Sequence, residues 1–215
     1  MNRPVKPIKT KEMFARDLKI SNSNVLAMIA FTLINIILII VNADISFPFS
    51  AAVPMYLVLM FSELCGMRSE EFYEMNYGPN WEQSEFIDSG VFWAVVVIAL
   101  IMIAVYFALW YFSKKKKVFS ILLTVLYAID TLGLLGFCTL IYAFDGYALI
   151  DFAFHAWVFY YLILALKAWD GMGYAPSEAQ LAAQATVPDT VPTFDDTLFD
   201  ATVEVSSETV SDEEK

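Results

Sequence analysis

Residues 111–120 read YFSKKKKVFS, and they place Lys114, Lys115, Lys116 and Lys117 between two long apolar stretches. The chain of 215 residues is otherwise acidic, with a formal net charge of -11. Hydrophobic residue types make up 59% of it and aromatic types 16%, more than a soluble domain of this length needs to fill its core. The composition therefore predicts an all-α integral membrane protein, and the lysines indicate how it is oriented.

Four stretches are apolar enough to cross a bilayer, at about 20 residues for roughly 30 Å of hydrocarbon. They are residues 25–42, 91–113, 118–144 and 147–168. The sequence thus predicts a four-helix transmembrane bundle over 25–168, preceded by a basic N-terminal segment, 1–24, and followed by an acidic tail, 169–215.

A fifth apolar stretch, 47–62, is short and contains Pro48 and Pro54. As a helix it would cover only about 24 Å, and proline interrupts the backbone hydrogen bonding that lipid cannot replace. Charge separates the alternatives, because short cytoplasmic loops collect Lys and Arg. If 47–62 does not span, eleven basic residues lie on the cytoplasmic side of the membrane and one lies on the other side. If it spans, the counts are seven and five. We therefore expect a re-entrant or interfacial segment.

This topology places the N-terminus, the lysine turn and the C-terminal tail in the cytoplasm, with the protein in the cell membrane. The lysines then face anionic lipid headgroups, each contributing about 1 kcal/mol. The tail is rich in Pro, Ser, Thr and acids and is predicted to be disordered. Phe194 and Phe199 lie among its acids and could instead dock on a basic partner.

The loop at 67–90, on the opposite side, interleaves aromatic residues with acids, which is typical of a cap at the headgroup region. Glu70, Glu71 and Glu74 could gather a cation, but calcium needs six to eight oxygens from a defined loop, so no metal site is expected. Cys65 and Cys138 are either free or bonded to each other, since two cysteines give no spacing signature.

Ionisable side chains inside the spans are the candidate functional residues, because they are costly to place in lipid. Asp151 and His155 are four residues apart and share one face of the last span. Counting outward from a tight turn at 145–146 puts Asp130 level with Tyr160 or Tyr161. Asp130 and His155 are then about 9 Å out of level, and we expect no contact between them.

Two interpretations of these residues stay open. Asp130 could be a protonated carboxyl bonded to a tyrosine hydroxyl, with Gly133 and Gly136 allowing close helix approach. Alternatively, Asp130, Asp151 and His155 could form a proton relay with the tyrosines.

Catalytic templates are missing. The single histidine excludes HExxH and multi-histidine sites, and no P-loop, GxSxG or GxGxxG motif occurs. We expect no catalytic residue, no cofactor and, given the acidic balance, no nucleic acid partner. The leading hypothesis is a membrane scaffold or accessory subunit whose tail or bundle face meets a protein partner. The alternative is a small proton- or cation-coupled transport component.

Overall fold

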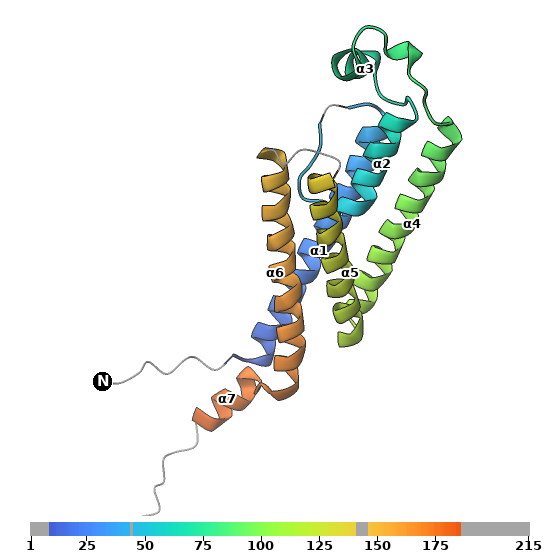
Figure 1. Cartoon of the computed structure of the whole chain (residues 1–215). Coiled ribbons are helices and arrows are strands. Elements are labelled where there is room, and N and C mark those ends of the chain that lie inside the picture. Colours follow the sequence, from blue (N-terminus) through green and yellow to red (C-terminus); the bar gives the residue numbers. More distant parts are fainter. Residues whose placement is uncertain (1–8, 44, 141–145, 186–215) are drawn as a thin grey trace, which may run out of the picture. The chain divides into compact units, whose positions relative to one another are not determined.

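The computed structural model describes residues 9–43, 45–140 and 146–185. These residues form seven α-helices and one 3-10 turn, Trp81–Gln83, without a strand among them. The helices, shown in Figure 1, are α1 Lys11–Ile40, α2 Ala52–Leu64, α3 Glu70–Tyr77, α4 Ser89–Ser113, α5 Lys117–Leu140, α6 Gly146–Tyr174 and α7 Glu178–Ala185. The chain divides into two units, Met1–Glu178 and Ala179–Lys215, and the first contains the bundle.

Four of the helices, α1, α4, α5 and α6, are long and apolar enough to cross a membrane. This supports the predicted multi-pass transmembrane protein. The fifth apolar stretch forms α2, which at 13 residues is well below the roughly 20 that a spanning helix needs.

The long helices run antiparallel to their neighbours. Trp110 Nε1 in α4 donates to the carbonyl of Asn22 in α1 at 2.7 Å, and Trp169 Nε1 in α6 donates to Ser120 Oγ in α5 at 3.1 Å. One end of the bundle therefore gathers the start of α1, the end of α4, the start of α5 and the end of α6. We call it the lysine end because it carries Lys114–Lys117, and we call the opposite end the cap end.

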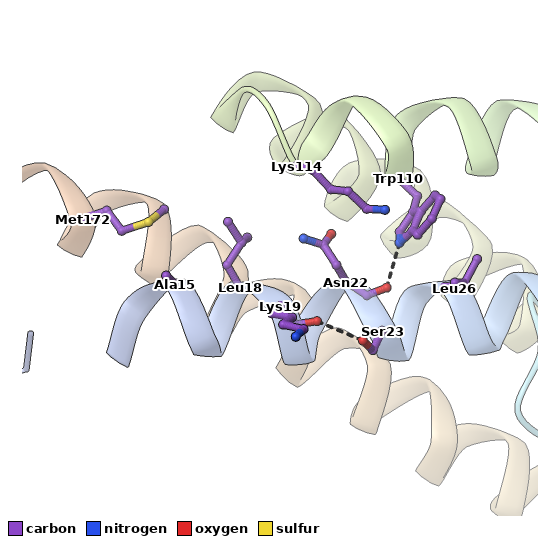
Figure 2. A pocket seen from close by; sticks show the side chains of 9 residues that line it. All are labelled: Ala15, Leu18, Lys19, Asn22, Ser23, Leu26, Trp110, Lys114 and Met172. Atoms are coloured by element: carbon purple, nitrogen blue, oxygen red, sulfur yellow. Dashed lines mark hydrogen bonds between the residues drawn. The ribbon is translucent and has the colours of Figure 1, made fainter. Parts of the chain in front are cut away.

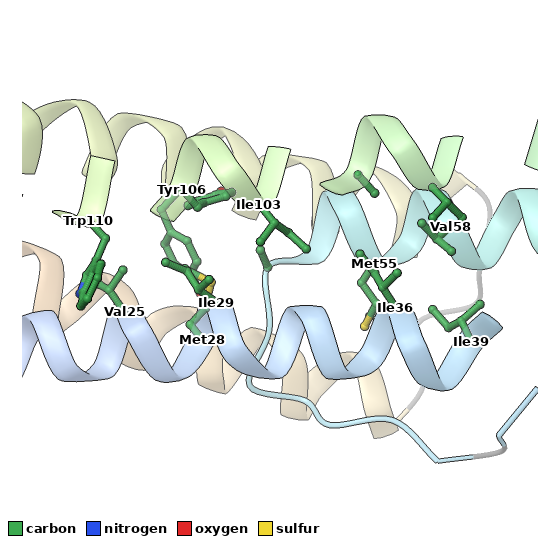
Figure 3. Close-up of a cluster of buried hydrophobic side chains, with 14 of the residues drawn as sticks. Val25, Met28, Ile29, Ile36, Ile39, Met55, Val58, Ile103, Tyr106 and Trp110 are labelled. Carbon is green, nitrogen blue, oxygen red and sulfur yellow. The ribbon is translucent and has the colours of Figure 1, made fainter. Parts of the chain in front are cut away.

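The apolar core lies mainly between α1, α2 and α4 (Figure 3). Val25 and Met28 of α1 face Tyr106 and Trp110 of α4 toward the lysine end. Nearer the cap end, Met55 and Val58 of α2 occupy the space beside α1 (Figure 3). Because lipid tails are as apolar as these side chains, the helices are held by close packing and by hydrogen bonds between them.

Several boundaries differ from those predicted. α1 already begins at Lys11, capped by Thr10 Oγ1, which accepts from Met13 N at 3.3 Å, so much of the segment 1–24 is helical and continuous with the first span. α6 runs past residue 168 to Tyr174, and α7 follows, so part of the predicted disordered tail is helical. The tail from 186 onward, including Phe194 and Phe199, and the predicted turn at Asp145 lie outside the described residues.

Aromatic side chains cluster in the predicted cap around Tyr73, which is fully buried. Its ring stacks on Trp81 with centroids 5.2 Å apart and meets Phe86 edge-on at 5.0 Å. The hydroxyl donates to the carbonyl of Glu63 at 2.9 Å, which ties the cap to the end of α2, and burial raises the pKa of this phenol. The loop 67–90 is therefore folded around one tyrosine.

The acids of the cap do not gather into a site. Glu70 and Glu71 occupy the first turn of α3, where their charge favours the helix N-terminus. Across the described part of the chain, His, Cys, Asp and Glu nowhere group in threes that could hold a metal ion. Cys65 and Cys138 are both buried, and no disulfide joins them.

Candidate functional site

The helix α2 begins inside the bundle, and its first turn is the centre of the polar site. Ala51 and Ala52 are each only 1% exposed, and no side chain of α2 itself caps its N-terminus. The first N–H groups of any α-helix lack partners within the helix. Lipid cannot accept these hydrogen bonds, so acceptors must come from neighbouring helices.

Each of these N–H groups has an acceptor. Ala51 N donates to Thr32 Oγ1 of α1 at 2.7 Å, and the N–H groups of Ala52 and Val53 donate to the two carboxyl oxygens of Asp130 at 2.8 and 2.9 Å. The next residue is Pro54, which has no N–H to satisfy. Asp130 is thus an N-cap supplied by another helix, α5.

The extended chain that leads into α2 is held by α1. Asn35 Nδ2 donates to the carbonyl of Phe47 at 2.7 Å, and Phe47 N donates to Asn35 Oδ1 at 2.8 Å. The amide side chain therefore pairs with the Phe47 backbone much as a neighbouring strand would. Asn35 and Thr32 lie three residues apart on one face of α1 and together satisfy the backbone of the entering chain.

His155 of α6 contacts Asp130, which overturns the expectation that the two would not meet. The distance from His155 Nε2 to Asp130 Oδ2 is 3.2 Å, and both side chains are 2% exposed. Tyr127 stacks on the imidazole with centroids 5.2 Å apart. The prediction counted from an assumed turn at 145–146, which put Tyr160 or Tyr161 level with Asp130. The contact with His155 places the partner about five residues earlier in α6.

The hydrogen bonds of His155 fix how many protons the pair holds. Nδ1 lies 2.9 Å from the carbonyl of Asp151, and a carbonyl only accepts, so Nδ1 carries a hydrogen. Nε2 faces a carboxyl oxygen of Asp130, so one further proton lies between them, on either the imidazole or the carboxyl. In both arrangements the pair has no net charge, which removes most of the cost of burying it.

A second acid holds the next turn of α2. Tyr56 OH donates to Asp151 Oδ2 at 2.8 Å, and the Tyr56 ring stacks on Phe137 of α5 with centroids 5.5 Å apart. Asp151 and His155 do share a face of α6, but the atom of Asp151 that meets the imidazole is its backbone carbonyl.

The two tyrosines expected beside Asp130 lie elsewhere. Tyr160 is 61% exposed, and its ring contacts Tyr161, which in turn contacts Trp157. These rings form an aromatic surface on α6, while Asp130 bonds to α2 and His155 instead.

The lysines lie in the tight connection between α4 and α5, as expected. Lys114 Nζ lies over the Trp110 ring, 3.3 Å from its centroid, and Lys115 Nζ lies 3.4 Å from Tyr111 OH. Lys117 forms an ion pair with Asp170 of α6.

Sequence reasoning missed Thr32, Asn35 and Tyr56. A signal for the first two was present, because polar residues three apart in an otherwise apolar span mark a face that meets something polar. No family model matches this chain, and neither a curated protein nor a solved structure is similar to it.

Proposed function

We propose that the protein is a non-enzymatic membrane scaffold or accessory subunit, built around a re-entrant segment that α2 completes. It crosses the cell membrane four times, with both termini and the lysine turn in the cytoplasm. Its partner is another protein, met through the acidic tail or a face of the bundle.

The geometry of α2 supports the re-entrant path. At about 1.5 Å per residue, its 13 residues cover roughly 20 Å, too little to span. It begins beside Asp130, near the middle of α5, and ends beside the start of α4, where Ile87 N donates to the carbonyl of Leu64 at 3.0 Å. The chain thus enters the bundle from the end where α1 finishes and returns to that same end. The path from α1 to α2 can be followed in Figure 1.

Charge supports the orientation. Basic residues of α1, of the α4–α5 connection and of α6 gather at the lysine end, namely Lys11, Arg16, Lys19, Lys114–Lys117 and Lys167. In the described part of the cap end, Arg68 is the one basic residue. Since cytoplasmic loops collect Lys and Arg, the lysine end belongs in the cytoplasm.

One observation supports a structural role for the buried acid Asp130. The carboxyl and imidazole atoms of the Asp130–His155 pair all have hydrogen-bond partners inside the bundle. Both carboxyl oxygens accept from the α2 backbone, and both imidazole nitrogens meet oxygen atoms of α5 or α6. A transport site must exchange such contacts for water or substrate during each cycle. Breaking them here would strand buried N–H groups at about 1–3 kcal/mol each, which favours a fixed clamp on α2.

Proton flux into reconstituted vesicles under an imposed pH gradient tests this proposal. The wild-type protein should show no more flux than empty vesicles or vesicles holding Asp130→Asn or His155→Gln. Flux that is present in the wild type and lost in either variant would refute the scaffold assignment. In parallel, mild-detergent purification of the full chain should bring a stoichiometric partner with it.

The alternative, a proton-coupled transport component, is favoured by two specific features. His155 Nε2 lies 3.2 Å from Asp130 Oδ2, and His155 lines a groove of about 420 Å³ between α5 and α6. The groove is lined by apolar side chains such as Leu132 and Phe159. A transporter should show proton flux in proportion to the amount of wild-type protein in the vesicles, and Asp130→Asn should lose that flux at the same amount of protein.

A further inference from the structure

A pocket of about 490 Å³ lies at the lysine end, between α1, α4 and α6 (Figure 2). Its volume falls within the range of about 300–1,000 Å³ that is usual for small-molecule sites. Lys19 of α1 and Lys114, which directly follows α4, supply two positive charges to its lining. Leu18, Leu26 and Met172 supply apolar surface. The pocket therefore combines cationic and apolar chemistry at one end of the spans.

The wall of the pocket is held in place by hydrogen bonds. Trp110 Nε1 donates to the Asn22 carbonyl at 2.7 Å, and the Asn22 side-chain oxygen accepts from Ser113 Oγ at 3.1 Å. The Ser113 hydroxyl also lies 2.7 Å from the Trp110 carbonyl, and Lys114 Nζ lies over the Trp110 ring, 3.3 Å from its centroid (Figure 2). These contacts fix Asn22 and Trp110 in the pocket wall and place the Lys114 charge beside Trp110.

Of the four lysines in the turn, Lys114 is the one that lines this pocket. Lys115 lies against Tyr111 and Lys117 against Asp170. The two positive charges of the pocket therefore come from Lys114 and from Lys19, which lies far from Lys114 in the sequence. This pairing distinguishes a defined site from the general attraction between a lysine turn and the membrane surface.

An anionic group bonded to Lys19 and Lys114 would balance the positive charge, but it would leave the leucines and Met172 without a partner. A molecule with an anionic head and an apolar chain uses both parts of the lining. Trp110 and the lysines are also residue types that favour the headgroup region, where such molecules are concentrated.

We propose that this pocket binds one anionic phospholipid from the leaflet at the lysine end. Its phosphate lies between Lys19 and Lys114, and one acyl chain lies along Leu18 and Leu26. This site goes beyond the scaffold role, because it makes the packing of α1 against α4 and α6 depend on the composition of the surrounding lipid.

Native mass spectrometry of the full chain in mild detergent tests the site, with phosphatidylglycerol, phosphatidylcholine of the same acyl chains, and inorganic phosphate as probes. The variant Lys19→Gln/Lys114→Gln removes the two pocket charges. The matched control, Lys116→Gln/Lys167→Gln, removes two charges from the same end of the bundle but outside the pocket lining.

We expect one phosphatidylglycerol to bind the wild type more tightly than phosphatidylcholine. At about five-fold per lysine, the pocket variant should bind it about 25-fold more weakly, and the control should change less than about three-fold. Equal losses in the two double variants would overturn the proposal in favour of diffuse attraction. Equal binding of the two lipids would overturn it, because the pocket would then not distinguish an anionic headgroup from a zwitterionic one. Displacement of the lipid by millimolar inorganic phosphate would also overturn it, since the site would then recognise a free anion.

Discussion

Asp130→Asn tests whether the carboxyl is a cap on α2, because asparagine keeps the shape but offers one acceptor oxygen in place of two. If that oxygen accepts from Val53 N, the new amide nitrogen faces the N–H of Ala52, and the opposite orientation strands Val53 instead. One buried N–H is therefore left unpaired in either case. The structure thus predicts that Asp130→Asn lowers the free energy of unfolding.

The size of the effect follows from the lost contacts. A stranded buried N–H costs about 1–3 kcal/mol, and losing an anion at a partly buried helix N-terminus costs about 0.3–2 kcal/mol. Hydrogen bonds between membrane helices average only about 0.6 kcal/mol, since unfolded helices find other partners in lipid. We therefore expect a loss of about 1.5–3 kcal/mol for Asp130→Asn and a larger one for Asp130→Leu, which strands both N–H groups.

The measurement is the free energy of unfolding in mixed micelles, titrated with a denaturing detergent and followed by helicity. Thr124→Val is the matched control in α5, because its hydroxyl donates within its own helix to the carbonyl of Ser120, and it should change stability by less than about 0.5 kcal/mol. If Asp130→Asn were no less stable than this control, the capping argument would be refuted.

Four further outcomes follow from the structure. Gly133→Ala would bring a Cβ within 2.3 Å of Val53 Cγ2 and should cost about 1–3 kcal/mol, whereas Gly136→Ala meets nothing within 4 Å and should be neutral or stabilising in the same unfolding assay. Because burial raises the pKa of Tyr73, the unfolded state loses its phenol proton first above pH of about 10. Stability should therefore fall as pH rises past that value, and Tyr73→Phe should abolish that part of the slope. Deleting residues 186–215 should leave the melting temperature in detergent unchanged, since a chain of that composition adds no packed surface. Topology reporters inserted at Lys116 and fused after the last residue should both read cytoplasmic, and an external signal from either would contradict the orientation.

The membrane class and the number of long helices could be predicted from the sequence because lipid imposes a simple rule on length and composition. Pro48 and Pro54 indicated that 47–62 would not form a long apolar helix, and the helix found there, α2, has 13 residues. The helical residues after 168 also carried a signal, since EAQLAAQA in α7 consists largely of strong helix formers. The prediction of disorder was wrong for residues up to 185 because it rested on the charge and proline content of the whole segment 169–215.

The polar contacts could not be predicted from the sequence. They depend on how deep in the bundle α2 begins and on how α5 and α6 are aligned along their lengths. Pro54 looked like a defect in a spanning helix, yet in the first turn of a buried helix it is the residue that leaves no donor unpaired. The partner of Asp130 is His155, about five residues before the Tyr160 that a count from the assumed turn gave. Such a shift of little more than one helical turn exchanges one side-chain partner for another.

Acidic residues inside a membrane are usually taken as functional because they are costly there, but α2 provides a structural reason for this one. A helix that begins within the bundle presents adjacent N–H groups, and a carboxylate is the compact side chain that can accept from two of them at once. A carboxyl in a buried site in turn requires a polar partner on its other side, and His155 Nε2 lies 3.2 Å from it. Asp130, His155 and the proline in the first turn are therefore all accounted for by the position of one helix N-terminus, and none of them requires a transported proton.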